Sequence, residues 1–173
     1  MRKFVPGSGF TIVELMIVVA IVAILAAVGL PSMRDLLKTN RMKTVSLDIY
    51  SSLTLARSEA IKRNSGSVSM IAAAGGWQNG WTVTCVDVAG SCGGADVVLH
   101  AQEAVDPSTI LVGPAANIVT YSRDGRLTTT AASFRITIGA DHPSVPMRCV
   151  DVTVSGRPNT RVDTNHTDSD GCN

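Results

Sequence analysis

The chain has 173 residues, 45% of them hydrophobic and 4% aromatic, and its formal net charge is +1. The charges are distributed unevenly along the chain. Residues 31–63 carry seven basic and three acidic side chains, whereas residues 64–173 carry six arginines, no lysine and ten acids. The acidic character of the larger part argues against a bulk nucleic-acid-binding protein.

The N-terminus combines a short basic leader, residues 1–9, with a long apolar run, residues 10–30. At 1.5 Å per residue, a helix of 21 residues is about 31 Å long, enough to cross a hydrocarbon core of about 30 Å. Arg2 and Lys3 precede the run, so the positive-inside rule predicts a cytoplasmic N-terminus and export of the rest. We therefore expect a single transmembrane helix over residues 10–30.

Glu14 is the one ionisable residue inside the apolar run. A carboxylate near bilayer depth costs about 2.5–3.5 kcal/mol on insertion scales, so we expect its charge to have a partner. The basic leader, Gly9-Phe10, Glu14 and the apolar helix together resemble the class III signal of type IV pilins. The alternative is a plain single-pass anchor in which Glu14 snorkels or is protonated.

The resemblance implies three roles at the N-terminus. A prepilin peptidase would cleave between Gly9 and Phe10, leaving the apolar helix in the mature chain. The new N-terminal residue, Phe10, would be N-methylated. Glu14 would face the N-terminal amine of a neighbouring subunit, so that the partner of this helix is another pilin helix.

A second helical segment, residues 31–63, follows the apolar run. Pro31 at its start removes one backbone donor and predicts a kink. An apolar stripe at spacings of three and four residues then predicts an amphipathic continuation of the helix, packed under a head domain. The basic side chains of this segment could face lipid headgroups, acidic surfaces of neighbouring subunits or solvent. The stripe consists of Met42, Val45, Ile49, Leu53, Ala56 and Ala60.

Residues 64–173 change to short β-type runs separated by turns rich in glycine, proline and aspartate. This pattern predicts one β-rich head domain, an antiparallel sheet packed on the amphipathic half of the helix. The fold class is therefore α+β. The expected strands are Ser67–Ala72, Trp81–Asp87, Val97–Ala101, Ile118–Tyr121, Ser133–Ile138 and Arg148–Val154.

All four cysteines lie in the part that we expect to be exported. An even number in an oxidising compartment predicts two disulfides, with three connectivities open. Proximity in the sequence favours Cys85–Cys92 and Cys149–Cys172. A zinc site is the weaker alternative, since no CxxC pair or nearby histidine has ligand spacing, and we expect no metal.

The segment Gly76–Trp81 contains both tryptophans of the chain and predicts a tight turn with two aromatic core anchors. It resembles the W-x-x-G-W signature of the GspH/FimT family of minor pilins and pseudopilins. Residues 55–63, 121–126 and 154–157 resemble segments of the same family. The resemblance implies a pilin-like fold, with a long N-terminal helix and a β-sandwich-like head.

The C-terminal segment 156–161 places Arg157 and Arg161 on a stretch that we expect to be an exposed turn. Some FimT-type minor pilins bind DNA through a C-terminal G-R-x-R motif. Gly156 and Arg157 match this motif, whereas Arg161 is displaced by two residues. Arginines on such a segment could contact phosphates without reading sequence, but three aspartates follow closely and would repel them. Contact with another pilin is the favoured interpretation, and DNA is a partner that we do not favour.

The sequence shows no catalytic pattern. It lacks a G-x-S-x-G elbow, an H-E-x-x-H motif, a Walker-type loop and a nucleotide-binding glycine fingerprint. The three histidines are isolated, and we expect each of them at the surface: His100, His142 and His166. We therefore expect neither an enzyme nor a cofactor.

The resemblance implies a minor type IV pilin that helps to initiate or cap pilus assembly and is linked to twitching motility. Its partners would be other minor and major pilins, the prepilin peptidase and the inner-membrane assembly machinery. It would lie in the inner membrane with its head in the periplasm, and later in a pilus or pseudopilus. A minor pseudopilin of type II secretion and a DNA-binding minor pilin for natural transformation are the alternatives.

Overall fold

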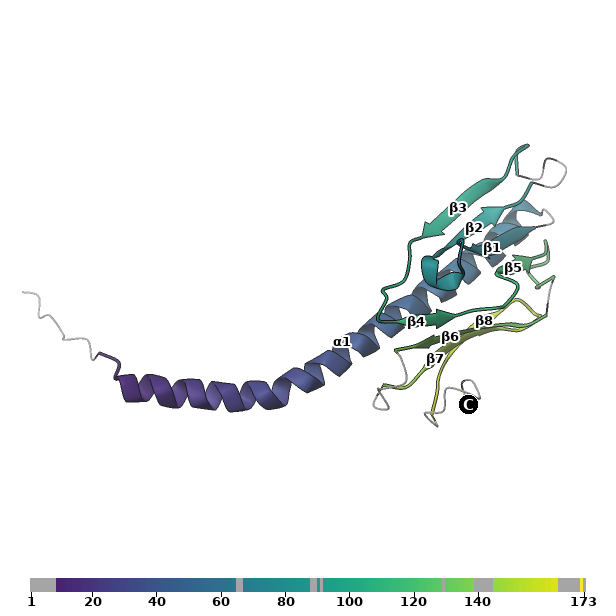
Figure 1. Cartoon of the computed structure of the whole chain (residues 1–173). Coiled ribbons are helices and arrows are strands. Elements are labelled where there is room, and N and C mark those ends of the chain that lie inside the picture. The colour runs from purple at the N-terminus through teal and green to yellow at the C-terminus, as the bar shows by residue number, and fades with distance from the viewer. Residues whose placement is uncertain are drawn as a thin grey trace, which may run out of the picture. The chain divides into compact units, whose positions relative to one another are not determined.

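A computed structural model describes residues 9–64, 67–87, 90, 92–128, 130–138, 145–164 and 172. The chain divides into two compact units, Met1–Leu37 and Lys38–Asn173. One helix, α1 (Ile12–Arg63), forms the described part of the first unit apart from residues 9–11 and continues into the second unit (Figure 1). The described residues of the second unit also form eight strands.

Helix α1 has 52 residues, with Glu14 in its first turn and Lys62 and Arg63 in its last. These charges complement the partial positive and negative charges at the two ends of a helix. Pro31 lies within α1, which is helical on both sides of it, and the kink expected there stays a prediction. None of the helices in the described residues is long and apolar enough to cross a membrane. The transmembrane helix over residues 10–30 likewise stays a prediction.

The head consists of two four-stranded antiparallel sheets. The first has the order β3-β2-β1-β5 and the second the order β4-β6-β7-β8. A short 3₁₀ helix, η1 (Trp77–Asn79), precedes β2. The strands are β1 (Val68–Ala72), β2 (Trp81–Cys85), β3 (Val97–Gln102), β4 (Ile110–Val112), β5 (Ile118–Tyr121), β6 (Ala132–Thr137), β7 (Arg148–Val152) and β8 (Pro158–Val162).

All six strands expected from the sequence are present, with bounds that differ by at most two residues at either end. Two strands, β4 and β8, were not expected. Strand β4 has only three residues, too few to show alternation. Strand β8 opens with Pro158 and Asn159, residue types that are depleted in strands.

The apolar stripe of α1 packs against the sheets, as its periodicity predicts. Val45 is partly buried, and five stripe residues have no exposed surface: Met42, Ile49, Leu53, Ala56 and Ala60. The largest fully buried side chains from the strands are Trp81, Tyr121 and Phe134. Trp81 Nε1 donates a hydrogen bond to the buried Ser52 Oγ at 2.9 Å, so the tryptophan also ties the helix to the first sheet.

The segment Trp77–Trp81 links the two sheets, because it leads into β2 of the first sheet and its Trp77 ring contacts β6 of the second. The rings of Trp77 and of Phe134 on β6 pack nearly perpendicular to each other, with centroids 4.8 Å apart and an interplanar angle of 85°. Trp77 Nε1 donates to Pro114 O at 3.0 Å. Gly80 has a φ of +99°, and a Cβ there would overlap the carbonyl oxygen of Gln102. Glycine in the W-x-x-G-W pattern is therefore required by the close approach of the backbone to the end of β3.

Candidate assembly site and interaction surfaces

The expected processing site lies immediately before α1, and its residues are accessible. Gly9 is exposed, and 73% of the Phe10 surface is exposed. Thr11 and Glu14 form a capping box at the start of the helix. The Glu14 N–H donates to Thr11 Oγ1 at 3.2 Å, and the Thr11 N–H donates to Glu14 Oε2 at 3.4 Å. Among the described residues no cation lies within ion-pair distance of Glu14, so its carboxylate keeps capacity for an amine.

The first unit exposes many apolar side chains on every face of the helix. Isolated exposed apolar residues are normal on a soluble protein, but a contiguous apolar surface indicates another environment than water. This surface is therefore suited to lipid or to other apolar helices. Its large members between residues 10 and 25 are Phe10, Ile12, Val13, Leu15, Met16, Ile17, Val18, Val19, Ile21, Val22, Ile24 and Leu25.

In the head, three of the four segments that resemble the GspH/FimT family converge at one place. We call it the Gly125 corner (residues 57–61 of α1 and the turns 122–126 and 153–157). Arg57 Nε donates to Gly125 O at 2.9 Å. A Cβ on Gly156, whose φ is +78°, would overlap the same carbonyl oxygen. Leu127 N–H donates to Val154 O at 3.1 Å. Arg57, Gly125 and Gly156 therefore all take part in packing the helix against the two turns.

Tyr121 is fully buried beside this corner. Burial raises the pKa of its hydroxyl, and the nearby Arg57 partly offsets the effect. The hydroxyl has no hydrogen-bond partner among the described residues. The ring therefore acts as a core residue, with its polar group held neutral at physiological pH.

The C-terminal segment is a strand rather than the exposed turn expected from the sequence. Residues Pro158–Val162 form β8 and pair with β7. Arg161 Nε and Nη2 both donate to Asp151 Oδ2, at 2.9 and 2.7 Å. Arg157 is exposed, and no described acid lies within ion-pair distance of it. The two arginines are therefore unequal, because the charge of Arg161 is already neutralised by a cross-strand carboxylate.

Two disulfides join the cysteines in the pairs favoured by proximity. Cys85 and Cys92 have Cα atoms 6.1 Å apart, and Cys149 and Cys172 have Cα atoms 6.0 Å apart. The first closes a loop at the end of β2. The second attaches residue 172 to β7.

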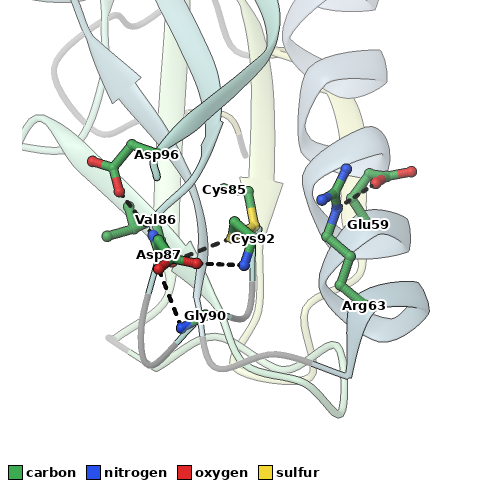
Figure 2. The surroundings of a disulfide bond; sticks show 8 residues. All are labelled: Glu59, Arg63, Cys85, Val86, Asp87, Gly90, Cys92 and Asp96. Carbon is green, nitrogen blue, oxygen red and sulfur yellow. Dashed lines mark hydrogen bonds and ion pairs between the residues drawn. A yellow bond between two sulfur atoms is a disulfide. The ribbon is translucent and has the colours of Figure 1, made fainter. Parts of the chain in front are cut away.

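Asp87 organises the loop closed by the first disulfide (Figure 2). Its Oδ1 accepts from the Cys92 N–H at 2.5 Å, and its Oδ2 accepts from the Gly90 N–H at 3.2 Å. Its own N–H donates to Asp96 Oδ1 at 2.8 Å. The Asp87 and Asp96 carboxylates therefore bind backbone N–H groups.

Across the described ranges no group of three histidine, cysteine or acidic side chains could hold a metal ion. His142 and His166 lie outside those ranges.

Comparison with known families identifies both parts of the chain. Residues 8–30 match the prokaryotic N-terminal methylation motif. Residues 46–156 match the family model of the type II transport protein GspH. The chain belongs to the GspH family. It is a GspH/FimT-like member of the minor pilins and pseudopilins. The GspH match includes the W-x-x-G-W segment and all of the Gly125 corner except residue 157.

Solved structures of minor pilins share the fold of this GspH-family chain. The type IV minor pilin FimU of Pseudomonas aeruginosa PAO1 matches with a TM-score of 0.58 at 17% identity, over 78% of this chain and 96% of that one. A second crystal form of FimU gives 0.55 at 19% identity, over 69% and 91%. The minor pseudopilin EpsH of the Vibrio cholerae type 2 secretion system gives 0.54 at 14% identity, over 70% and 97%. No curated protein sequence matches.

The sequence did not reveal two residues that organise the head. Ser52 is a polar residue on the helix, yet it is buried as the acceptor for Trp81. Gln78 reaches from η1 to β4, where it accepts from Leu111 N–H at 2.7 Å and donates to Thr109 O at 2.8 Å. A serine within an otherwise apolar helix face was the only local signal for either residue.

Proposed function

We propose that this GspH-family chain is a minor type IV pilin, a structural subunit that helps to initiate or cap pilus assembly. The observation that carries the proposal is the combination of an N-terminal methylation motif at residues 8–30 with a GspH head at residues 46–156. In such a chain the N-terminal helix is suited to anchoring in the membrane and to packing against other pilin helices. The head is suited to contacts with the heads of other subunits. The likeness of the head to FimU supports a role in pili.

The proposed mechanism is assembly. Cleavage after Gly9 leaves Phe10 as a methylated N-terminal residue, and the exposed apolar surface of the first unit anchors the chain in the inner membrane with its head in the periplasm. During assembly this surface packs against other pilin helices. The Glu14 carboxylate then leaves its own capping box and neutralises the amine of a neighbouring subunit.

We propose a structural role and no catalytic one. Several charged groups of the head serve structural contacts: Asp87 binds backbone N–H groups, Asp151 pairs with Arg161, and Glu59 pairs with Arg63 at 2.8 Å. The Arg63 and Lys62 side chains beside Glu59 lower the pKa of that carboxyl. Figure 2 shows the Glu59–Arg63 pair on the last turns of α1.

A minor pseudopilin of type II secretion is the second candidate, because EpsH also shares the fold. The two candidates differ in the filament that contains the chain. Deleting the gene in its own host and counting surface pili, with secretion of extracellular enzymes measured in parallel, separates them. We expect fewer pili and normal secretion; normal pili with impaired secretion would favour the pseudopilin.

The proposal is tested directly by mass spectrometry of the membrane-extracted chain. We expect a mature protein that begins with methylated Phe10, and slower processing of the Gly9→Ala variant. An intact leader in cells with an active prepilin peptidase would contradict the proposal. A cut after Leu30, as for an ordinary secretory signal, would also contradict it.

A further inference from the structure

Each sheet of the head has two edge strands, β3 and β5 in the first and β4 and β8 in the second. An edge strand presents a row of unpaired N–H and C=O groups, which attracts a further strand unless the protein protects that edge. The described residues protect these four edges to different degrees.

Three edges are protected, each by a different device. Strand β5 leads into a turn that folds back along it, and Thr128 N–H donates to Thr120 O at 3.0 Å. On β4, the Gln78 amide occupies the outward backbone groups. Strand β8 begins with Pro158, which has no N–H to offer a further strand and so discourages strand addition.

Strand β3 lacks these three devices. Its pairing with β2 shifts register at Leu99, whereas residues 100–102 pair regularly, so the open stretch is centred on Ala101. The strand has six residues, compared with three, four and five for β4, β5 and β8. It contains neither proline nor a charged residue, and Val97 and Val98 are 37% and 59% exposed. In Figure 1 it forms the outer strand of its sheet, and no described segment pairs with its free side.

The register shows which backbone groups point away from the sheet. Ala73 N–H donates to Gly80 O, so the even-numbered residues of β2 bond to β1 and the odd-numbered ones bond to β3. His100 and Gln102 lie opposite odd-numbered residues of β2, and their backbone groups therefore face β2. Ala101 lies between them and directs its N–H and C=O to the free edge.

The charges around β3 distinguish between partners. Residues 64–122 contain four acids and no lysine or arginine. Two of these acids, Asp96 and Glu103, directly flank β3. If all six residues of β3 paired antiparallel with the same residues of a second copy, Asp96 would lie opposite Glu103 at both ends. A parallel pair in register would place identical acids together. Like charges in these positions destabilise strand pairing, so the edge favours a different chain with basic residues.

We propose that the free edge of β3 binds an extended strand of a different filament subunit, in which apolar residues are flanked by lysine or arginine. Backbone bonds at Ala101 would provide affinity, and contacts with Val98 and the flanking acids would provide specificity. This inference rests on the proposed function, because the partner is another subunit of the same filament.

Photocrosslinking of the full-length chain in its native host tests the inference. Benzoylphenylalanine replaces Ala101, which is exposed, and in a matched control it replaces Ile110, which is 45% exposed on β4. We expect position 101 to give a crosslink that maps to an extended, Lys- or Arg-flanked segment of another subunit, and position 110 to give none. The Glu103→Lys change should abolish the crosslink at position 101.

The amount of the chain in sheared filaments is measured in the same cells. A chain that enters filaments but gives no crosslink at position 101 refutes the docking edge and leaves the proposed function intact. A crosslink to a second copy, to a helix or to a protein outside the filament also refutes it, as does a crosslink that survives Glu103→Lys. A chain that never enters filaments refutes the proposed function and this inference with it.

Discussion

Replacing Gln78 with alanine should destabilise the head by about 2–4 kcal/mol, because it leaves two buried backbone groups without partners. The side-chain amide binds β4 as a neighbouring strand would, accepting from Leu111 N–H at 2.7 Å and donating to Thr109 O at 2.8 Å. Thr109 and Leu111 are 0% and 5% exposed, so water cannot readily replace the lost bonds. The change should lower the melting temperature by about 6–12 °C for a domain of this size.

Intrinsic tryptophan fluorescence of the full-length chain in detergent measures this effect. The two tryptophans of the chain, Trp77 and Trp81, are 4% and 1% exposed in the head, so their emission reports its unfolding. Asn79→Ala is the matched control in the same turn, since it removes one exposed bond to Ala74 O and should cost less than about 1 kcal/mol. Equal melting temperatures for the Gln78→Ala variant and the control would refute the reasoning.

Gln78→Glu refines the test, because it keeps the acceptor for Leu111 N–H and replaces the donor to Thr109 O. An ionised carboxylate would face a carbonyl oxygen, so the pKa of the introduced group should lie above its unfolded value. Such a group stabilises the fold when protonated and loses that contribution as pH rises through the folded pKa. The variant should therefore approach wild-type stability as the pH falls toward about 4. A deficit that does not change with pH would contradict this explanation.

Three further predictions concern assembly, the tail and the disulfides. Glu14→Val should preserve or improve membrane insertion while preventing incorporation into filaments; normal incorporation, measured by immunoblot of sheared filaments, would show that the charge has no docking role. The full-length chain should not bind duplex DNA at physiological salt, since Arg161 is paired with Asp151; salt-sensitive micromolar binding that disappears on changing Arg157 and Arg161 to alanine would make DNA uptake the leading function. Non-reducing peptide mapping should recover both disulfides, each worth about 2–4 kcal/mol, and crossed pairs would contradict the arrangement of the tail.

Features that depend on neighbouring residues could be predicted from the sequence. The spacing of apolar residues in α1 predicted its buried face, because helical periodicity brings residues three and four apart onto one side. The leader, the cleavage pair and Glu14 are contiguous, and residues 8–30 match the methylation motif. Proximity also favoured the cysteine pairs that the structure forms. The cleavage, methylation and docking roles are read from that motif and stay predictions.

Features that depend on distant residues were decided by the tertiary structure. Strand β8 forms despite Pro158 and Asn159 because β7 supplies its hydrogen bonds. The two arginines expected on an exposed turn therefore differ: Arg161 pairs with Asp151, whereas no acid among the described residues is within ion-pair distance of Arg157. In the sequence, Gly156 resembled part of a DNA-binding motif. In the structure, its close approach to the Gly125 carbonyl oxygen is by itself a sufficient reason for a glycine at this position.

The sequence by itself thus determined the kind of molecule: an apolar N-terminal helix with one acid, an amphipathic continuation and a β-rich head. These are properties of local periodicity and of short contiguous motifs. Only the tertiary structure decided which strand edges of the head the described residues cover. Backbone groups are identical along the chain, so whether a strand has a free edge depends on what the rest of the fold places beside it. Gln78 closes β4 from 33 residues away, whereas nothing in the described chain closes β3.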